Sequence, residues 1–272
     1  MRRLDGRTVV VTGASAGIGA AAAKRFASLG ANVAVVGRSK EKTTAVARQI
    51  GGTPYTVDFA RLDDVRRLAD DLDYPTIDVL ANNAGLISDT RKMTPDGNEI
   101  TFQVNHLAPF LLTHLLTDRL KAAPEARVIT TASAAHGFAR LDLDDLGFGA
   151  RKYGKQSAYG TSKLANILFT QELARRTAGT SVTASCFHPG PVSTDFFRDM
   201  GFARLVLWMA LRPEQGARPL VHLATVDDPE TVNGAYYSRM KRREPKRTSA
   251  ELAARLWEAS ERLVGLGDQA DR

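Results

Sequence analysis

The alternation of strand-like and helix-like runs constrains the fold of this chain more than any other feature of its 272 residues. Short apolar, β-branched runs alternate with segments that carry apolar residues at helical spacing. Strands are predicted at 8–11, 32–36, 53–57, 77–81, 126–131 and 182–187, and helices at 16–29, 40–50, 61–72, 97–122 and 157–176. Apolar strands separated by helices indicate a parallel sheet covered on both faces. The right-handed crossover rule then predicts an α/β fold, a doubly wound parallel sheet in a single domain.

A glycine-rich segment joins the first predicted strand to the first predicted helix. It reads Thr12-Gly13-Ala14-Ser15-Ala16-Gly17-Ile18-Gly19, so its glycines follow the spacing GxxxGxG. The pyrophosphate of a dinucleotide needs a tight turn, a close approach of the backbone and the positive end of a helix. An ordinary glycine turn at a helix start would also fit these residues. The strand before and the helix after favour a nucleotide loop, with these candidate contacts: Gly13, Ser15, Gly17, Ile18 and Gly19.

The residues after the second predicted strand bear on the choice of cofactor. An acidic side chain there would bind the adenosine 2′-hydroxyl and repel a 2′-phosphate. This chain has Gly37-Arg38-Ser39 instead. The guanidinium of Arg38 is planar and permanently charged, which suits a phosphate. We therefore expect NADP(H) to be preferred, with NAD(H) still possible, and the alternative is that Arg38 is a plain surface arginine.

Charge and cysteine content narrow the classes of partner. The formal net charge is +7, but most arginines are scattered among acidic residues, and the one dense run, Lys241-Arg242-Arg243, is typical of a solvated surface segment. We expect no nucleic-acid partner, although positive charge by itself would fit one. No stretch of about 18 apolar residues is present, and the single Cys186 cannot form an intramolecular disulfide. We expect a cytoplasmic protein with no integral membrane segment.

One pair of side chains predicts proton-transfer chemistry. Tyr159 and Lys163 are four residues apart in the predicted helix 157–176, so they lie on one helix face. A phenol with an ordinary pKa near 10 is a poor acid or base at neutral pH. A nearby ammonium stabilises the phenolate and lowers that pKa. The pair can therefore act as an acid/base unit, although such pairs also occur on ordinary helix surfaces.

Taken together in order, the motifs resemble the short-chain dehydrogenase/reductase (SDR) family over nearly the whole chain. They are Thr12 to Gly19, Asn82-Asn83-Ala84-Gly85, Asn105, Ser133, Tyr159 with Lys163, and Pro189-Gly190. The resemblance implies a Rossmann-type domain over 1–272, with residues 1–125 mainly binding the dinucleotide and 126–272 forming the catalytic and substrate-binding part. It also implies direct hydride transfer between the nicotinamide and a carbonyl or alcohol, with geometry and proton handling supplied by the protein.

The resemblance further implies roles for single residues. Tyr159 exchanges the proton with the substrate oxygen, Lys163 lowers the pKa of Tyr159 and binds the nicotinamide ribose, and Ser133 polarises the carbonyl. Asn105 holds a water that links Lys163 to solvent. The remaining expected cofactor contacts are Asp58, Phe59, Asn82, Ala84, Gly85, Pro189, Gly190, Val192 and Thr194.

Each of these residues also has a structural interpretation. Ser133 could cap a strand end, Asn105 could bond to the backbone inside its helix, and Asn82-Asn83 could be turn residues. The resemblance assigns no chemistry to a histidine, so His136 and His188 are expected to pack or to form hydrogen bonds, and Cys186 to be buried.

The segment Phe102 to Leu112 and the C-terminal Leu256-Trp257-Glu258 are similar to the retinol-dehydrogenase-like branch of the family. This branch implies a lipophilic small-molecule substrate. Apolar residues at 195–211 predict a lid over it or, alternatively, a packing face. Helices 97–122 and 157–176 could form the face of a homodimer or homotetramer. The alternative function, from a class other than enzymes, is that of a catalytically silent, nucleotide-binding regulatory protein with the same fold.

Overall fold

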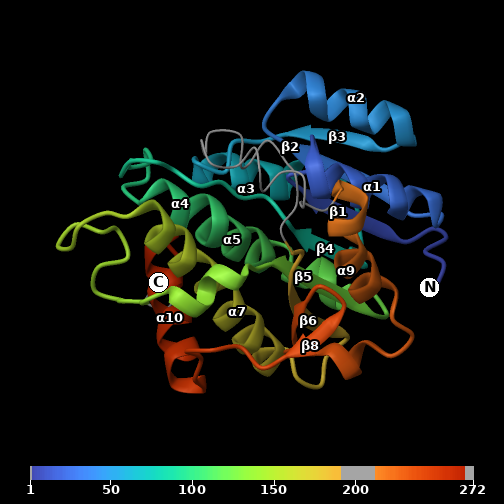
Figure 1. Cartoon of the computed structure of the whole chain (residues 1–272). Helices are drawn as coiled ribbons and strands as arrows, with labels where there is room; N and C mark the ends of the chain where they lie inside the picture. Colours follow the sequence, from blue (N-terminus) through green and yellow to red (C-terminus); the bar gives the residue numbers. More distant parts are fainter. Residues whose placement is uncertain (1, 191–211, 267–272) are drawn as a thin grey trace, which may run out of the picture.

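The computed structural model describes residues 2–190 and 212–266, and it contains one mostly parallel sheet (Figure 1). The strand order is β3-β2-β1-β4-β5-β6-β7-β8, in which β7 and β8 are antiparallel and every other neighbouring pair is parallel. The strands are β1 (Thr8–Thr12), β2 (Asn32–Gly37), β3 (Thr53–Thr56), β4 (Val79–Asn82), β5 (Ala126–Thr131), β6 (Val182–His188), β7 (Tyr236–Ser238) and β8 (Lys241–Arg243). The predicted doubly wound α/β fold is confirmed.

Helices cover both faces of the sheet. The principal ones are α1 (Gly17–Ser28), α2 (Lys40–Ile50), α3 (Leu62–Asp71), α5 (Ala108–Leu115), α7 (Lys155–Arg176), α9 (Pro213–Thr225) and α10 (Ala250–Leu263). Side chains of α1, α2 and α9 share one apolar core, and those of α3, α5, α7 and α10 share the other. Helices α1 and α9 lie side by side in Figure 1, as their many contacts require. The strand order reverses between β1 and β4, and the crevice beyond their carboxyl ends is where doubly wound folds bind ligands.

The region predicted as one helix over 97–122 is broken, so that prediction is wrong in detail. It contains a single turn, α4 (Ile100–Phe102), a π-helix, η1 (Gln103–Leu107), then α5 and finally α6 (Thr117–Ala122). Glu99 starts the region, because its Oε2 accepts the Phe102 N–H at 2.8 Å. A π-helical turn is uncommon and often marks a functional site. Here it contains Asn105.

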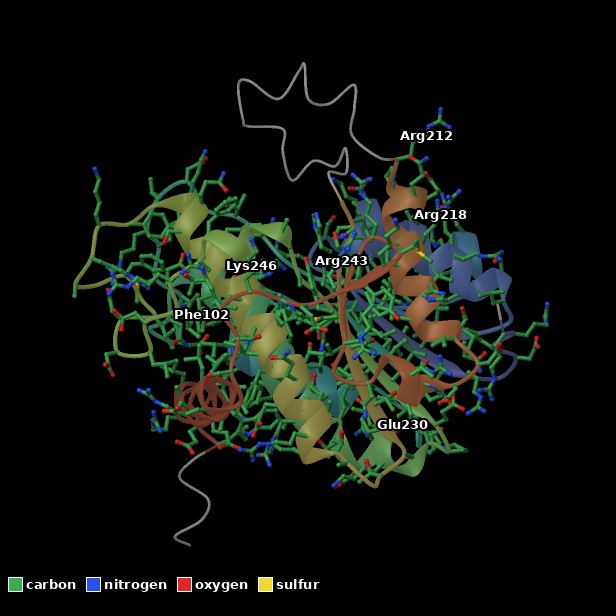
Figure 2. All side chains as sticks on the ribbon, turned by 60° about the horizontal axis from the view of Figure 1, so that its bottom comes forward. Phe102, Arg212, Arg218, Glu230, Arg243 and Lys246 are labelled. Atoms are coloured by element: carbon green, nitrogen blue, oxygen red, sulfur yellow. The ribbon has the colours of Figure 1, made fainter. Side chains whose placement is uncertain are left out.

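The C-terminal part of the chain adds elements that the sequence pattern did not predict. The basic run Lys241-Arg242-Arg243 forms β8, whose three residues are exposed at the sheet edge, so its expected place on the surface is confirmed. Figure 2 shows Lys246 on the connection from β8 to α10, and its backbone N–H donates to His136 Nε2 at 3.4 Å. None of the described helices is long and apolar enough to cross a membrane. The expected lid at 195–211 lies outside the described residues.

Candidate active site

The structure brings Tyr159, Lys163 and Ser133 together. Tyr159 and Lys163 lie on α7, and the Lys163 Nζ is 5.6 Å from the centroid of the Tyr159 ring. Ser133 follows β5 and begins a 3-10 helix, η2 (Ala134–Phe138), because its Oγ accepts the Ala135 N–H at 3.2 Å. A hydrogen bond joins the side chains of Ser133 and Tyr159. Ser133 therefore caps the start of this 3-10 helix, not the end of the strand as the structural interpretation had it, and it is also a hydrogen-bond partner of Tyr159.

Burial controls the protonation of this group. Desolvation raises the pKa of Tyr159 to about 12, against a smaller lowering by the Ser133 hydrogen bond. Desolvation also lowers the pKa of Lys163 to about 7. Lys163 is buried and donates from Nζ to the Thr131 carbonyl at 2.9 Å. The expected lowering of the Tyr159 pKa by Lys163 is not found, because the shift is set by burial and by the Ser133 hydrogen bond, without a contribution from Lys163.

Asn105 is placed beside this group by the π-helix. Its Oδ1 accepts the Leu86 N–H at 2.7 Å, and its Nδ2 donates to the Leu86 carbonyl and the Ser162 Oγ, each at 2.9 Å. A Cβ added to Gly85 would lie 3.1 Å from Asn105 Oδ1 and 3.5 Å from Lys163 Nζ. The Asn105 amide therefore holds the segment after β4 beside Lys163. Its backbone partner is Leu86, outside the helix, so the structural interpretation of a bond inside the helix is wrong.

The glycine loop has the backbone geometry that a phosphate-binding turn requires. Gly13 and Gly17 have φ angles of +67° and +57°, which side chains with a Cβ rarely adopt. A Cβ on Gly19 would lie 2.3 Å from the Gly13 carbonyl oxygen and 2.6 Å from Asn83 Nδ2. The N-cap residue of α1, Ala16, makes no side-chain capping hydrogen bond, and the first turn carries no acidic residue. The backbone N–H groups there can therefore point at an anion.

Asn83 is the residue that braces this loop, and the sequence did not single it out. Its Nδ2 donates to the Thr12 carbonyl at 3.0 Å, and the backbone N–H groups of Asn83 and Ala84 donate to Thr12 Oγ1 at 3.0 and 3.1 Å. The predicted contact Asn82 is buried and turned to the other side, where its Nδ2 donates to Thr113 Oγ1 at 3.0 Å. Its side chain thus faces α5 rather than the loop.

The adenosine end of the expected site lies at the ends of β2 and β3. The Val57 N–H donates to the Gly37 carbonyl at 3.1 Å, which places Asp58 next to Arg38. Arg38 is exposed and has no ion-pair partner among the residues with described positions. Asp58 Oδ1 accepts the Ala60 N–H at 3.0 Å, whereas Phe59 is buried in the core. The Phe59 side chain packs into the core, and its contact with a cofactor stays a prediction.

A Cβ on Gly37 would lie 2.8 Å from the Cβ of Ser15, so Ser15 packs against the end of β2. The predicted nicotinamide contacts Pro189 and Gly190 follow β6, and Gly190 has a φ of +95°. Val192 and Thr194 lie outside the described residues.

His136 behaves as expected from the sequence, whereas the buried Nδ1 of His188 has no hydrogen-bond partner among the described residues. His136 packs against Tyr236 with ring centroids 5.0 Å apart, and its Nδ1 lies 2.7 Å from the Ser133 carbonyl oxygen. His188 ends β6, and burial lowers its pKa to about 4. Cys186 is buried, as predicted.

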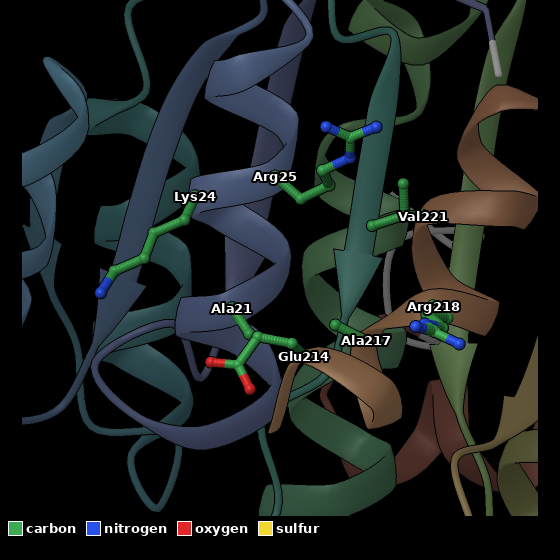
Figure 3. Close-up of a pocket in the computed structure, with 7 residues that line it drawn as sticks. All are labelled: Ala21, Lys24, Arg25, Glu214, Ala217, Arg218 and Val221. Carbon is green, nitrogen blue, oxygen red and sulfur yellow. The ribbon is translucent and has the colours of Figure 1, made fainter. Parts of the chain in front are cut away.

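A separate pocket of about 480 Å³ lies between α1 and α9 (Figure 3). Its lining residues are Ala21, Lys24, Arg25, Glu214, Ala217, Arg218 and Val221. None of the predicted site residues is among them, so hydrogen bonding and topology, rather than this pocket, locate the candidate active site.

Comparison with known proteins agrees with this geometry. A family model described as short chain dehydrogenase matches residues 7–203. The chain is 39% identical over 284 residues to retinol dehydrogenase 13 of Homo sapiens, covering 97% of this chain and 86% of that protein. It is 43% identical over 281 residues to "Putative daunorubicin C-13 ketoreductase DnrU" of Streptomyces sp. (strain C5), covering 96% and 94% of the two chains.

Two solved structures extend the comparison. A protein from Mycobacterium paratuberculosis superposes with a TM-score of 0.81 at 36% identity, covering 97% of this chain and 96% of that chain. A short chain dehydrogenase from Burkholderia cenocepacia in complex with NADP superposes with a TM-score of 0.70 at 27% identity, covering 87% and 97% of the two chains.

Proposed function

Because the chain belongs to the short-chain dehydrogenase/reductase family, we propose that it is an NADP(H)-preferring carbonyl reductase or alcohol dehydrogenase whose acid/base is Tyr159. Membership of the family, with retinol-dehydrogenase-like relatives, makes it an NAD(P)-dependent oxidoreductase acting on alcohols and carbonyls. The observation that carries the proposal is the meeting of Tyr159, Lys163 and Ser133 at the carboxyl end of the sheet. A catalytically silent regulator would have no need of that arrangement.

The glycine loop and the helix α1 would hold the cofactor. Gly13, Gly17 and Gly19 allow the backbone to approach the pyrophosphate, and the uncapped first turn of α1 supplies N–H donors. Ser15, Ile18, Ala84 and Gly85 would complete this cradle, and Asp58 would contact the adenine ring. When bound, the nicotinamide gives or takes the hydride.

The protein's own side chains would handle the proton. The Tyr159 hydroxyl protonates the carbonyl oxygen during reduction and takes the proton back during oxidation. Because burial raises the Tyr159 pKa to about 12, the phenol stays protonated until negative charge develops on the substrate oxygen. Ser133 donates to the same oxygen, and Lys163 would bind the nicotinamide ribose beside Tyr159.

Arg38 supports the preference for NADP(H). Its exposed guanidinium follows β2, where a 2′-phosphate would need a cation, and no acidic side chain among the described residues pairs with it. A guanidinium binds a phosphate by paired, charge-assisted hydrogen bonds.

One exposed aromatic side chain close to Ser133 in the chain supports a lipophilic substrate. Phe138, in the 3-10 helix that Ser133 caps, is 88% exposed. The names of two relatives refer to a retinol dehydrogenase and to a daunorubicin C-13 ketoreductase. We also propose a cytoplasmic location, which the single buried cysteine supports.

The decisive experiment compares two tyrosines. Tyr159→Phe removes the transferable proton and keeps the ring, so kcat for an apolar ketone should fall by about 100-fold or more while NADPH still binds. Tyr55→Phe is the matched control, because this half-buried hydroxyl lies on β3 at the sheet edge and hydrogen-bonds Tyr74. Its kcat should stay within about twofold of the parent. Substantial turnover in the Tyr159→Phe protein would disprove the assignment.

A further inference from the structure

The carbonyl of Thr131 is the anchor of the catalytic lysine, and it has two donors. Lys163 Nζ donates to it at 2.9 Å, and Asn166 Nδ2 donates at 3.1 Å. A carbonyl oxygen has two lone pairs, so these two bonds fill its capacity. Lys163 and Asn166 are both buried, so water does not replace either bond. Because Asn166 occupies one lone pair of the Thr131 carbonyl oxygen, the Lys163 ammonium can bind only at the other.

The orientation of the Asn166 amide depends on His106. With Nδ2 turned to Thr131, Oδ1 needs a donor, and it lies 3.3 Å from His106 Nδ1. This contact is favourable only if Nδ1 carries the ring proton. If the amide turned over, its oxygen would face the Thr131 carbonyl and its NH₂ would face that ring N–H, and both contacts would be repulsive.

The other ring nitrogen of His106 reaches the C-terminal helix. Its Nε2 lies 2.9 Å from Ser260 Oγ on α10, and the Ser260 hydroxyl donates to the Leu256 carbonyl at 2.8 Å. Asn166 fixes the ring tautomer, because its NH₂ faces the Thr131 carbonyl and its Oδ1 needs a donor at Nδ1. Nε2 then accepts, and the single Ser260 proton is shared between the Leu256 carbonyl and Nε2. The hydrogen bonds thus run from α10 through His106 and Asn166 to the anchor of Lys163.

The surroundings of His106 keep it neutral and fixed. The ring is fully buried among Phe102, Phe110 and Phe169, with centroid distances of 5.0, 6.1 and 6.2 Å. Burial, with a contribution from the Lys163 charge, lowers the pKa of His106 to about 4. It is therefore neutral throughout the pH range in which the enzyme would work.

We propose that His106 and Asn166 are positioning residues, which hold the ammonium of Lys163 toward the cofactor ribose and Tyr159 and connect it to Ser260 on α10. Neither residue touches the reacting atoms. The inference rests on the proposed function, because it takes Lys163 to be the cofactor-binding and proton-handling lysine. It predicts that a defect in His106 or Asn166 acts through Lys163.

The first test uses Asn166→Leu, which keeps the volume of the side chain and removes both hydrogen bonds. Purified protein is assayed with NADPH and a model apolar ketone. We expect kcat to fall about tenfold and the Kd for NADPH to rise about fivefold, because small displacements of a catalytic group are costly. The KM for the ketone should stay within about twofold.

A double-mutant cycle with Lys163→Met then asks whether the effect passes through Lys163. In the Lys163→Met protein, adding Asn166→Leu should change kcat and the NADPH Kd by less than about twofold, because residues that act as one unit are not additive. The same full loss in both backgrounds would overturn the inference, since Asn166 would then act by another route.

Matched histidine variants keep the test valid if a variant folds poorly. The amide nitrogen of His106→Asn can take the place of Nδ1 and restore the donor to Asn166, whereas His106→Gln places its amide near Nε2. We expect the Asn variant to recover most of the kcat that the Gln variant loses. Equal activity of the two variants would overturn the inference.

Thr177→Val is the structural control, because Thr177 is equally buried at the far end of α7 and its hydroxyl donates to the Leu173 carbonyl at 2.8 Å. It should change neither kcat nor the NADPH Kd by more than about twofold. If Lys163→Met alone changes neither quantity, the role of Lys163 and this inference both fall. If Lys163→Met is impaired and Asn166→Leu is not, only this inference falls.

Discussion

Gly13 and Gly51 form a matched pair that tests why the nucleotide loop needs glycine. Both have a φ of +67°, so an alanine at either position is forced into the left-handed region. That strain costs about 1–2 kcal/mol for a residue with a Cβ. A Cβ on Gly51 meets nothing within 4 Å, whereas a Cβ on Gly13 would lie 2.8 Å from the Ala84 Cα and 3.0 Å from the Ala84 N. The two substitutions therefore share the strain and differ in the clash.

The clash cannot be relieved by turning a side chain, because the obstructing atoms belong to the backbone. The Ala84 N–H is held by Thr12 Oγ1, next to Gly13 itself. Overpacking of this kind costs about 1–3 kcal/mol in addition to the strain. We expect Gly51→Ala to lower the free energy of unfolding by about 1 kcal/mol and to leave NADPH binding unchanged.

Gly13→Ala should lower the free energy of unfolding by about 2–5 kcal/mol and weaken NADPH binding at least about tenfold, which is about 1.4 kcal/mol. Urea unfolding and a fluorescence titration with NADPH measure the two quantities. Equal loss of stability in the two variants, with unchanged NADPH affinity in both, would refute the reasoning. The clash with Ala84 would then make no contribution to the free energy of unfolding or of NADPH binding.

Three further predictions follow from other parts of the molecule. Arg38→Asp should raise the Kd for NADPH at least about tenfold and change that for NADH much less; equal effects on both cofactors would contradict the phosphate contact. Trp257→Ala should lower the free energy of unfolding by about 3–5 kcal/mol in urea, because it removes the contacts with Phe110 and Phe169; a loss below about 1 kcal/mol would contradict it. The pKa of His106 is about 4 in the folded protein, below the ordinary value near 6.5 that it has in the unfolded chain. The stability that this difference provides is therefore fully present above about pH 6.5 and is lost as the pH falls toward 4. His106→Phe should therefore show a smaller loss of stability between pH 7 and pH 5 than the parent does, and parallel losses would argue against it.

The sequence predicted the sheet well because apolar strands buried on both faces differ sharply from the helices between them. Strand β5 begins and ends at the predicted residues, and α2 occupies the predicted 40–50. Strand β8 was not predicted, since Lys241-Arg242-Arg243 is basic throughout and pairs only at the exposed edge. Nothing in the alternation of apolar residues distinguishes such an edge strand from a loop.

The break in the region 97–122 could not be read from periodicity. Almost all of the side chains in η1 and α5 are buried, so no polar face marks the change from a helix of one pitch to another. The bonds of Asn105 to Leu86 and Ser162, from segments distant in sequence, contribute to the local geometry. A π-helix held in this way depends on tertiary contacts that a local pattern does not contain.

Site residues were predicted best where the chemistry lies in one side chain. Tyr159, Lys163 and Ser133 meet as expected, but the pKa of Tyr159 depends on desolvation, which spacing along a helix does not give. The strand period did contain the signal that separates Asn82 from Asn83. Successive side chains of a strand point to opposite faces, so one of the two asparagines must face α5 and the other the loop.

The C-terminal helix α10 packs against the surface that helices 97–122 and 157–176 were predicted to use for contact with a second subunit. Trp257 of α10 stacks on Phe169 at 5.8 Å and meets Phe110 edge-on at 4.9 Å, so it lies across α5 and α7. Ser260, one turn further along, reaches His106. The apolar surface that would favour association is therefore covered, at these residues, by the chain's own α10. The same contacts place α10 within three hydrogen bonds of the Thr131 carbonyl that anchors Lys163, so the helix that closes the core also supports the candidate active site.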